Sequence, residues 1–218
     1  MKKSTKRILY FGLSIENFSD KNSAVHYPLI KIVPRKNIKR SLLEVEKFSH
    51  IIFTSQTTVD IFFSHISKIQ HPQCISIGPH TKKALLKKGI FSECPQGYTQ
   101  EGIIQYLKTC SLKNSYIFLP RSSLARKKID RFLSENNVKF ATLALYDTKF
   151  YKPNGKINFQ DFEEFVFTSP STVDSFFHFF QEIPPHIKVR HIGPITKAAY
   201  ESRLEKNRVE VYDDLKTN

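Results

Sequence analysis

The sequence predicts an α/β protein made of two similar domains, each with a parallel β-sheet flanked by helices, joined by a two-stranded β linker. Three observations support this architecture: two motifs that each occur twice, a regular alternation of strand-like and helix-like segments, and strands that are apolar along most of their length. Alternating strands and helices are typical of parallel sheets. Nearly continuous apolar strands indicate that both faces of the sheet are covered.

The internal repeat is the strongest of these signals. FTSQTTVDIFF (53–63) returns as FTSPSTVDSFF (167–177) with eight of eleven positions identical, and IGPHTKKA (77–84) returns as IGPITKAA (192–199) with six of eight. The offset is 114 residues for the first pair and 115 for the second. Two motifs in one order at nearly one offset indicate the duplication of a domain. A chain of 218 residues has room for two such domains.

The elements can be assigned in order from hydrophobic periodicity and from helix start signals. The first strand begins near Arg7, and we interpret the basic start of the chain as leading into it rather than as a signal peptide. The predicted strands are 7–13, 51–54, 74–77, 116–119, 140–145, 165–168, 188–192 and 209–212, and the predicted helices are 57–69, 81–88, 100–109, 123–136, 172–181 and 196–206.

The two halves are not simply consecutive. Residues 1–30 are too few for a domain, and the second repeat from residue 150 supplies only about three strands. We therefore expect a discontinuous domain made of residues 1–30 and 150–218, with residues 35–145 inserted into it. The linkers at about 28–34 and 143–150 are extended and β-prone, which predicts that they pair as a hinge.

Composition limits the classes of function. The excess of 34 basic over 20 acidic side chains gives a net charge of +14, which attracts polyanions of any kind. Three cysteines without C-x-x-C spacing predict free thiols in a reducing cytoplasm. No apolar run reaches the roughly 20 residues of a membrane helix. The histidines lack zinc-site spacing, and no GxGxxG, P-loop or G-x-S-x-G motif is present, so we expect neither a metal nor an organic cofactor.

Each repeated motif places a helix start directly after a strand. Ser169 followed by Pro170 is typical of an N-cap with proline at the first helical position, and Ser55 is equivalent. Helix N-termini carry unpaired N–H groups and a partial positive charge, so they bind anions at the carboxyl edge of a parallel sheet. Simple capping is the structural alternative for any one motif. We expect anion contacts from both motif pairs: Thr54, Ser55, Gly78, Thr81, Ser169, Ser171, Gly193 and Thr196.

Taken together, these motifs resemble the uroporphyrinogen-III synthase family. The resemblance runs through both FTS and both IGPxT motifs, GYTQEGIIQYL (97–107) and YIFLPRSSLARKKIDRFL into LALYDT (116–133 and 143–148). It implies two flavodoxin-like or Rossmann-like domains with the active site between them. It also implies cyclisation of linear hydroxymethylbilane to uroporphyrinogen III, with loss of water and inversion of ring D, without metal or organic cofactor.

The resemblance also suggests one individual site residue, and a second candidate follows from its position at a strand end. Tyr146 matches the tyrosine of the family's V-Y-x-T segment, and its phenol can hydrogen-bond the departing hydroxyl; packing at the hinge is the alternative. Because an ordinary tyrosine pKa is about 10, an orienting donor is favoured over a true acid. Arg121, at a strand end in LPRSS, is a candidate substrate contact or a surface residue.

Two other classes of function remain open from the residues alone. A non-enzymatic two-domain binder of anionic small molecules would keep the helix-start sites and tolerate the loss of Tyr146. A nucleic-acid binder would show affinity that falls steeply with salt, but no stacking module is evident. The resemblance favours the enzyme, acting as a cytoplasmic monomer without nucleic-acid or membrane partners and in transient contact with hydroxymethylbilane synthase.

Overall fold

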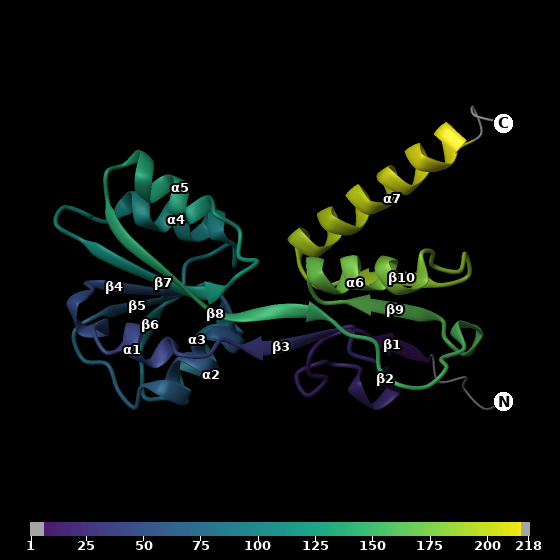
Figure 1. Cartoon of the computed structure of the whole chain (residues 1–218), viewed down its shortest axis with the longest axis horizontal. Coiled ribbons are helices and arrows are strands. Elements are labelled where there is room, and N and C mark those ends of the chain that lie inside the picture. Colours follow the sequence, from purple (N-terminus) through teal and green to yellow (C-terminus); the bar gives the residue numbers. More distant parts are fainter. Residues whose placement is uncertain (1–6, 215–218) are drawn as a thin grey trace. The chain divides into compact units, whose positions relative to one another are not determined.

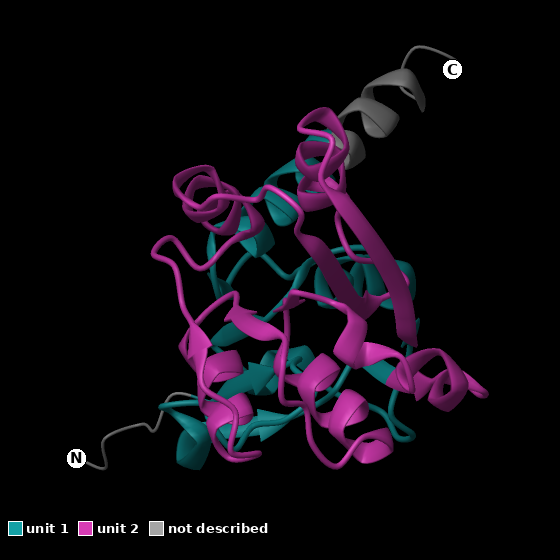
Figure 2. Ribbon diagram, turned by 90° about the vertical axis from the view of Figure 1, so that its left-hand side faces the viewer, with its two compact units in different colours: residues 1–31, 148–218 teal, residues 32–147 magenta. Residues whose placement is uncertain are grey.

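The computed structural model describes residues 7–214, with side chains through residue 205, and divides the chain into two compact units (Figures 1 and 2). Unit 1 comprises residues 1–31 and 148–218, and unit 2 comprises residues 32–147. Residues 1–6 and 215–218, which the sequence assigns to the discontinuous domain, lie outside the described residues.

Unit 1 is built on a four-stranded parallel sheet. Its strand order is β10 (Lys188–His191), β9 (Glu164–Phe167), β1 (Ile8–Tyr10) and β2 (Ala24–His26). Strand β9 leads into α6 (Pro170–Phe180), and β10 leads into α7 (Pro194–Asp214). Two short 3₁₀ helices, Lys21–Ser23 and Phe159–Asp161, precede β2 and β9.

The two faces of this sheet are covered differently. Phe11, Phe165 and Phe167 pack with Phe176 of α6 in an aromatic core, to which α7 adds Tyr200. The alternate strand residues Ile8, Tyr10 and Val166 form a smaller cluster on the other face. The loop between β1 and β2 closes that cluster with Phe18. On this face a loop thus takes the place that a helix occupies on the other.

Unit 2 contains the larger sheet. Its order is β3 (Ile30–Pro34), β8 (Lys139–Phe150), β7 (Tyr116–Ser122), β4 (His50–Phe53), β5 (Gln73–Ser76) and β6 (Ser92–Glu93). The pairs from β8 to β6 are parallel. The helices are α1 (Ile38–Leu42), α2 (Gln56–His65), α3 (Pro79–Leu86), α4 (Gln100–Thr109) and α5 (Lys128–Glu135), and a 3₁₀ turn spans Val45–Lys47.

Helices cover both faces of the unit 2 sheet, with α4 and α5 on one side and α1, α2 and α3 on the other (Figure 1). The side chains of β4 alternate between these two faces. Ile51 and Phe53 are buried in the core with α2 and α3, whereas Ile52 is buried in the core with α4 and α5. The continuous apolar strand of the sequence is therefore a strand buried on both faces.

Most predicted elements are confirmed, with shifted ends, but one is wrong. The valines and tyrosine of residues 209–212 predict a strand, whereas α7 continues through them to Asp214. No glycine or proline after Pro194 interrupts this helix. Residues with high β-propensity form a strand only where a partner strand is present. The sequence pattern also leaves out the strands at 24–26 and 92–93 and the helix at 38–42.

The three cysteines are free, as expected. Cys74 is buried, and burial raises the pKa of its thiol to about 12, whereas Cys94 and Cys110 are partly exposed. Among the described helices, none has the length and apolar character that a membrane crossing requires.

Candidate active site

The first FTS motif forms the predicted helix cap in unit 2. Strand β4 ends at Phe53, Thr54 follows half-buried, and Ser55 adopts an extended backbone as the N-cap of α2. The Ser55 hydroxyl accepts a hydrogen bond from the Thr58 N–H at 3.1 Å, and the two hydroxyl oxygens lie 2.8 Å apart. The cap is therefore confirmed, and it lies at the carboxyl edge of the parallel sheet.

Tyr146 reaches this cap from strand β8. Its phenol oxygen lies 3.1 Å from Ser55 Oγ, and the side chain is only 5% exposed. The parallel register between β7 and β8 shifts between Arg121 and Ser122, so that Ser122 pairs with Tyr146 rather than with Leu145. Leu145 and Tyr146, although consecutive, are buried in the same core. Because strand side chains normally alternate between faces, this irregularity is what turns the phenol toward α2.

The IGPxT motif of unit 2 supplies the next helix start along the same edge. Gly78 is the N-cap of α3 in an extended conformation, Pro79 occupies the first helical turn, and Thr81 is buried. Tyr98 packs against Gly78: a Cβ built on the glycine would lie 3.4 Å from Tyr98 Cβ. Tyr98 is 59% exposed and has a positive φ of 43°, which is uncommon for an aromatic residue. Sequence reasoning did not identify this tyrosine, although Gly97 before it signals a tight turn.

The second FTS motif builds a stronger cap in unit 1. The Ser169 hydroxyl accepts from the Thr172 N–H at 3.4 Å, and the Thr172 hydroxyl accepts from the Ser169 N–H at 3.2 Å. These reciprocal bonds form a capping box, with Pro170 in the first turn of α6. Ser171 is half-buried in that turn. The predicted cap is again confirmed, at the carboxyl edge of the unit 1 sheet.

The second IGPxT motif differs from the first in its backbone. Gly193 has a φ of 86°, a left-handed conformation that favours glycine, and it is exposed. The buried Thr196 hydroxyl donates to the Ile192 carbonyl at 2.9 Å. This hydroxyl therefore already has a partner within the turn. Its contact with substrate stays a prediction, and a purely structural role is the alternative.

The predicted site residue Arg121 and the nearby basic residues of unit 2 form ion pairs. The Arg121 guanidinium donates to both carboxylate oxygens of Asp130 at 2.6 Å, and the two side chains are 14% and 16% exposed. A neutralised guanidinium attracts a further carboxylate less than an unpaired one does, so substrate binding by Arg121 stays a prediction. Arg126 and Lys128 both contact Glu101 at 2.8 Å, and they lower the pKa of that carboxyl to about 2.

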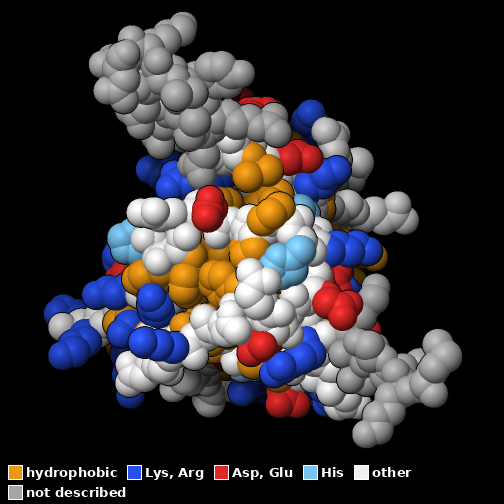
Figure 3. Space-filling view, turned by 90° about the vertical axis from the view of Figure 1, so that its right-hand side faces the viewer, with side chains coloured by type: hydrophobic (Ala, Val, Ile, Leu, Met, Phe, Trp, Pro, Cys, Tyr) orange, Lys and Arg blue, Asp and Glu red, His pale blue; other side chains and the backbone are white. Residues whose placement is uncertain are grey.

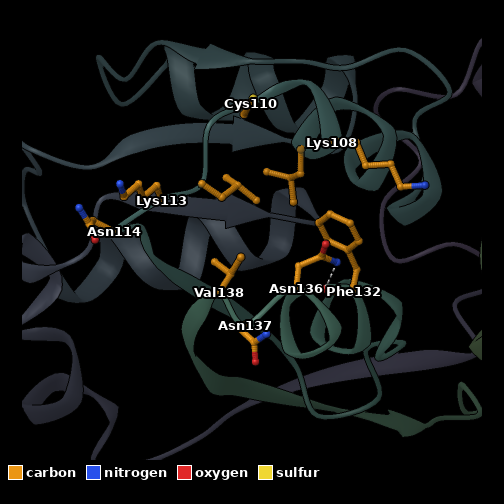
Figure 4. Close-up of a pocket in the computed structure, with 10 residues that line it drawn as sticks. Lys108, Cys110, Lys113, Asn114, Phe132, Asn136, Asn137 and Val138 are labelled. Atoms are coloured by element: carbon orange, nitrogen blue, oxygen red, sulfur yellow. Dashed lines mark hydrogen bonds between the residues drawn. The ribbon is translucent and has the colours of Figure 1, made fainter.

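A pocket of about 480 Å³ lies elsewhere in unit 2, where α4 and α5 end and strands β7 and β8 begin (Figure 4). Phe132 and Val138 border it, and the Asn136 side chain donates to the Phe132 carbonyl at 2.8 Å. It is at the amino edge of the sheet, opposite the helix starts, and contains none of the predicted site residues. Among the side chains that the structure describes, residues 7–205, no cluster of three or more His, Cys, Asp or Glu is arranged to hold a metal ion.

Comparison with known proteins gives consistent relatives. The model of the family described as uroporphyrinogen-III synthase HemD matches residues 22–210. The porphyrin biosynthesis protein HemD of Ruminiclostridium josui is 24% identical over 73% of this chain, but the match spans only 35% of that protein's length. A putative uroporphyrinogen-III synthase of Methanothermobacter thermautotrophicus is 25% identical over 77% of this chain and 74% of its own length.

Solved structures share the fold at low sequence identity. A mutant uroporphyrinogen III synthase of Thermus thermophilus has a TM-score of 0.64 at 11% identity, covering 91% of this chain and 89% of that one. The uroporphyrinogen-III synthetase of Helicobacter pylori has a TM-score of 0.61 at 17% identity, with the same coverage. These likenesses support a mixed α/β fold with parallel sheets flanked by helices. Since the family model matches most of the chain, this protein belongs to the uroporphyrinogen-III synthase family.

Proposed function

We propose that this chain cyclises linear hydroxymethylbilane to uroporphyrinogen III, with loss of water and inversion of ring D, in tetrapyrrole (haem) biosynthesis. The observation that carries the proposal is the family match over residues 22–210. The contact between Tyr146 and Ser55 supports it, because it joins the candidate hydrogen-bond donor to a helix start at which we expect an anion to bind.

The substrate's chemistry fits this arrangement. The bilane bears eight carboxylates, which suit helix N-termini and a basic protein. Loss of its hydroxyl gives an azafulvene that closes unaided to the wrong isomer. The protein's task is therefore to hold the chain so that the substituted carbon of ring D attacks, and to keep water from the intermediate.

Tyr146 is the residue that we assign to the departing hydroxyl. Ser55 holds its phenol by one hydrogen bond, and Thr58 holds Ser55 by two close contacts. This series of hydrogen bonds, from Thr58 through Ser55 to Tyr146, fixes the orientation of the phenol before substrate binds. A phenol so held can donate a hydrogen bond to the leaving oxygen without becoming a free acid.

We further propose that the two units are two domains hinged by the neighbouring strands β3 and β8, and that each contributes helix starts to the substrate. The support is that the chain passes between the units only in these strands. At the unit 2 end of these strands, the Arg35 N–H donates to the Leu145 carbonyl at 2.8 Å, and the Arg35 guanidinium pairs with Asp147. Both contacts hold the strands together there.

The enzyme is proposed to act as a cytoplasmic monomer. Three free cysteines fit a reducing compartment. Because the bilane closes unaided to the type I isomer, transient contact with hydroxymethylbilane synthase, which would supply it, fits the chemistry.

The face of the molecule shown in Figure 3 gives little support to a nucleic-acid binder. On the face shown in Figure 3, Lys and Arg side chains are spread around an apolar centre, with acidic side chains between them. A phosphate backbone is bound by a continuous basic track, whereas the centre of this face is apolar. The stronger competitor is a binder of anionic small molecules without catalysis.

The test uses bilane generated in the reaction mixture, followed by oxidation and chromatographic separation of the uroporphyrin isomers. We expect native protein to divert the product from type I to type III, relative to a heat-denatured control. A bilane binder without catalysis would slow closure but leave type I as the product, and that result would overturn the proposal.

A further inference from the structure

The end of strand β7 sets the backbone position of Tyr146. The register between β7 and β8 is regular through Arg121, after which Ser122 pairs with Tyr146 and Leu145 is left as an extra residue. The Ser123 N–H then donates to the Tyr146 carbonyl at 3.0 Å. The direction of the phenol therefore depends on where the last residues of β7, and the first residue of the loop after it, are held.

The Arg121 side chain attaches this strand end to helix α5. Leu119, two residues earlier, is buried in the core with α4 and α5, and strand alternation places Arg121 on the same face. There its guanidinium donates to both carboxylate oxygens of Asp130, in the first turn of α5, at 2.6 Å. Two parallel bonds between planar groups fix direction as well as distance. The strand end is thus held from the face opposite the core that buries Tyr146.

The far end of the loop between β7 and α5 is held by helix α4. Gln100, buried in the first turn of α4, donates to the Arg126 carbonyl at 3.0 Å and accepts from the Lys128 N–H at 3.2 Å. Its neighbour Glu101 contacts the side chains of Arg126 and Lys128 at 2.8 Å. Both ends of the loop are therefore fixed, by Arg121 at its start and by Gln100 and Glu101 at its end.

We propose that Arg121 is a positioning residue for the cyclisation, which acts through Tyr146 and does not contact the substrate. Paired with Asp130, it holds the end of β7 at the register shift, and the shift directs the phenol toward the departing hydroxyl. The proposal rests on the proposed function and deepens it. It gives the segments 97–107 and 116–133 a common task, because their contacts with each other hold the loop that bonds to the Tyr146 backbone.

The test begins with Asp130→Asn, which keeps the size of the side chain and removes its charge. We expect kcat for type III formation to fall about fivefold with KM near its native value, because a misplaced donor slows the chemistry while the anion contacts remain. In a Tyr146→Phe background the same change should have almost no further effect on the rate. A change that only loosened the fold would lower both rates alike. Arg121→Lys keeps the charge but not the two parallel bonds, and it should give a smaller loss of the same kind.

Glu164→Gln is the matched control. Glu164 of β9 accepts two bonds from Arg190, at 2.6 and 2.9 Å, in an ion pair of the same geometry in unit 1. Breaking this pair should lower the melting temperature, as Asp130→Asn does, but should leave kcat native. The comparison separates loss of an ion pair from loss of position at Tyr146.

Fluorine NMR gives a readout that does not depend on activity. With fluorotyrosine in place of tyrosine, the resonance of Tyr146 is the one missing from Tyr146→Phe. It should shift in Asp130→Asn and stay in place in Glu164→Gln. If the native chain formed no type III product, the proposed function would fail, yet this resonance would still show whether the ion pair positions the phenol.

Three results would overturn the proposal. One is an unmoved Tyr146 resonance in Asp130→Asn. Another is an equal loss of rate from Asp130→Asn with and without the Tyr146 hydroxyl. The third is a lower KM in Asp130→Asn, which would show that Arg121, once released from its partner, binds a carboxylate of the substrate.

Discussion

The phenol oxygen of Tyr146 lies 3.1 Å from Ser55 Oγ, which joins strand β8 to the N-cap of α2. Two residues 91 positions apart in the chain thus meet at the carboxyl edge of one sheet. The contact gives a buried phenol a fixed direction, and it makes the cap of α2 part of the candidate chemistry.

Removing the phenol hydroxyl should slow type III formation by more than about tenfold in Tyr146→Phe, the loss expected for one hydrogen bond to a group that develops charge. Affinity for uroporphyrin III should be retained, because the anion contacts remain. The measurement is single-turnover isomer analysis, with Tyr116→Phe, at the amino end of β7, as the control. A native rate in Tyr146→Phe would remove this residue from the mechanism.

The contact itself can be tested with a double-mutant cycle. Ser55→Ala should slow the reaction and should add little to Tyr146→Phe, because each change breaks the same hydrogen bond. We expect a coupling free energy of about 0.5–1.5 kcal/mol between the two sites. Strict additivity of the two effects on the rate would show that Ser55 and Tyr146 act independently.

The two IGPxT glycines should respond differently to alanine. Gly193 has a φ of 86°, so Gly193→Ala should lower the free energy of unfolding by about 1–2 kcal/mol. Gly78 is extended, and a Cβ there would only touch Tyr98, so Gly78→Ala should fold with nearly native stability. Urea denaturation compares the two variants. Equal destabilisation would contradict the assigned backbone conformations.

The paired threonines offer another contrast. Thr196→Val should cost about 1 kcal/mol of stability, because the Ile192 carbonyl loses its donor, and Thr196→Ser should restore it. Thr81→Ala should reduce activity only moderately, by the equivalent of about 0.5–1.5 kcal/mol, since the substrate's carboxylates are shared among many donors. A folded but inactive Thr81→Ala protein would assign Thr81 to catalysis rather than binding.

The ion pairs of Glu101 predict that the free energy of unfolding depends on pH. Arg126 and Lys128 lower its pKa to about 2, below the ordinary value of about 4.5, so its contribution is present above pH 4.5 and is lost as the pH falls toward 2. The stability difference between the native chain and Glu101→Gln should therefore shrink between pH 5 and pH 2. Glu163→Gln, at an exposed position, is the control for urea midpoints across this range. A difference that is constant with pH would contradict the ion pairs.

The sequence predicted the helix caps because capping is local: Ser55 and Ser169 each bond to an N–H three residues away. The alternation of strands and helices was also predictable, because hydrophobic periodicity is a local property of each segment. The β7–β8 register shift that turns Tyr146 toward Ser55 depends on a neighbouring strand, and no local pattern marks it. Strand β2 was missed because it is three residues long, and its pairing with β1 is set by tertiary contacts. The Arg121–Asp130 pair was missed because a lone arginine does not reveal its partner.

The proposed function is tested most directly by the isomer composition formed with substoichiometric protein, at about one molecule per hundred of bilane, with EDTA present. We predict that type III product predominates and that its yield far exceeds the amount of protein, because the chain turns over without a metal ion. An isomer ratio that stays at the non-enzymatic value, even with stoichiometric protein, would contradict the proposed function.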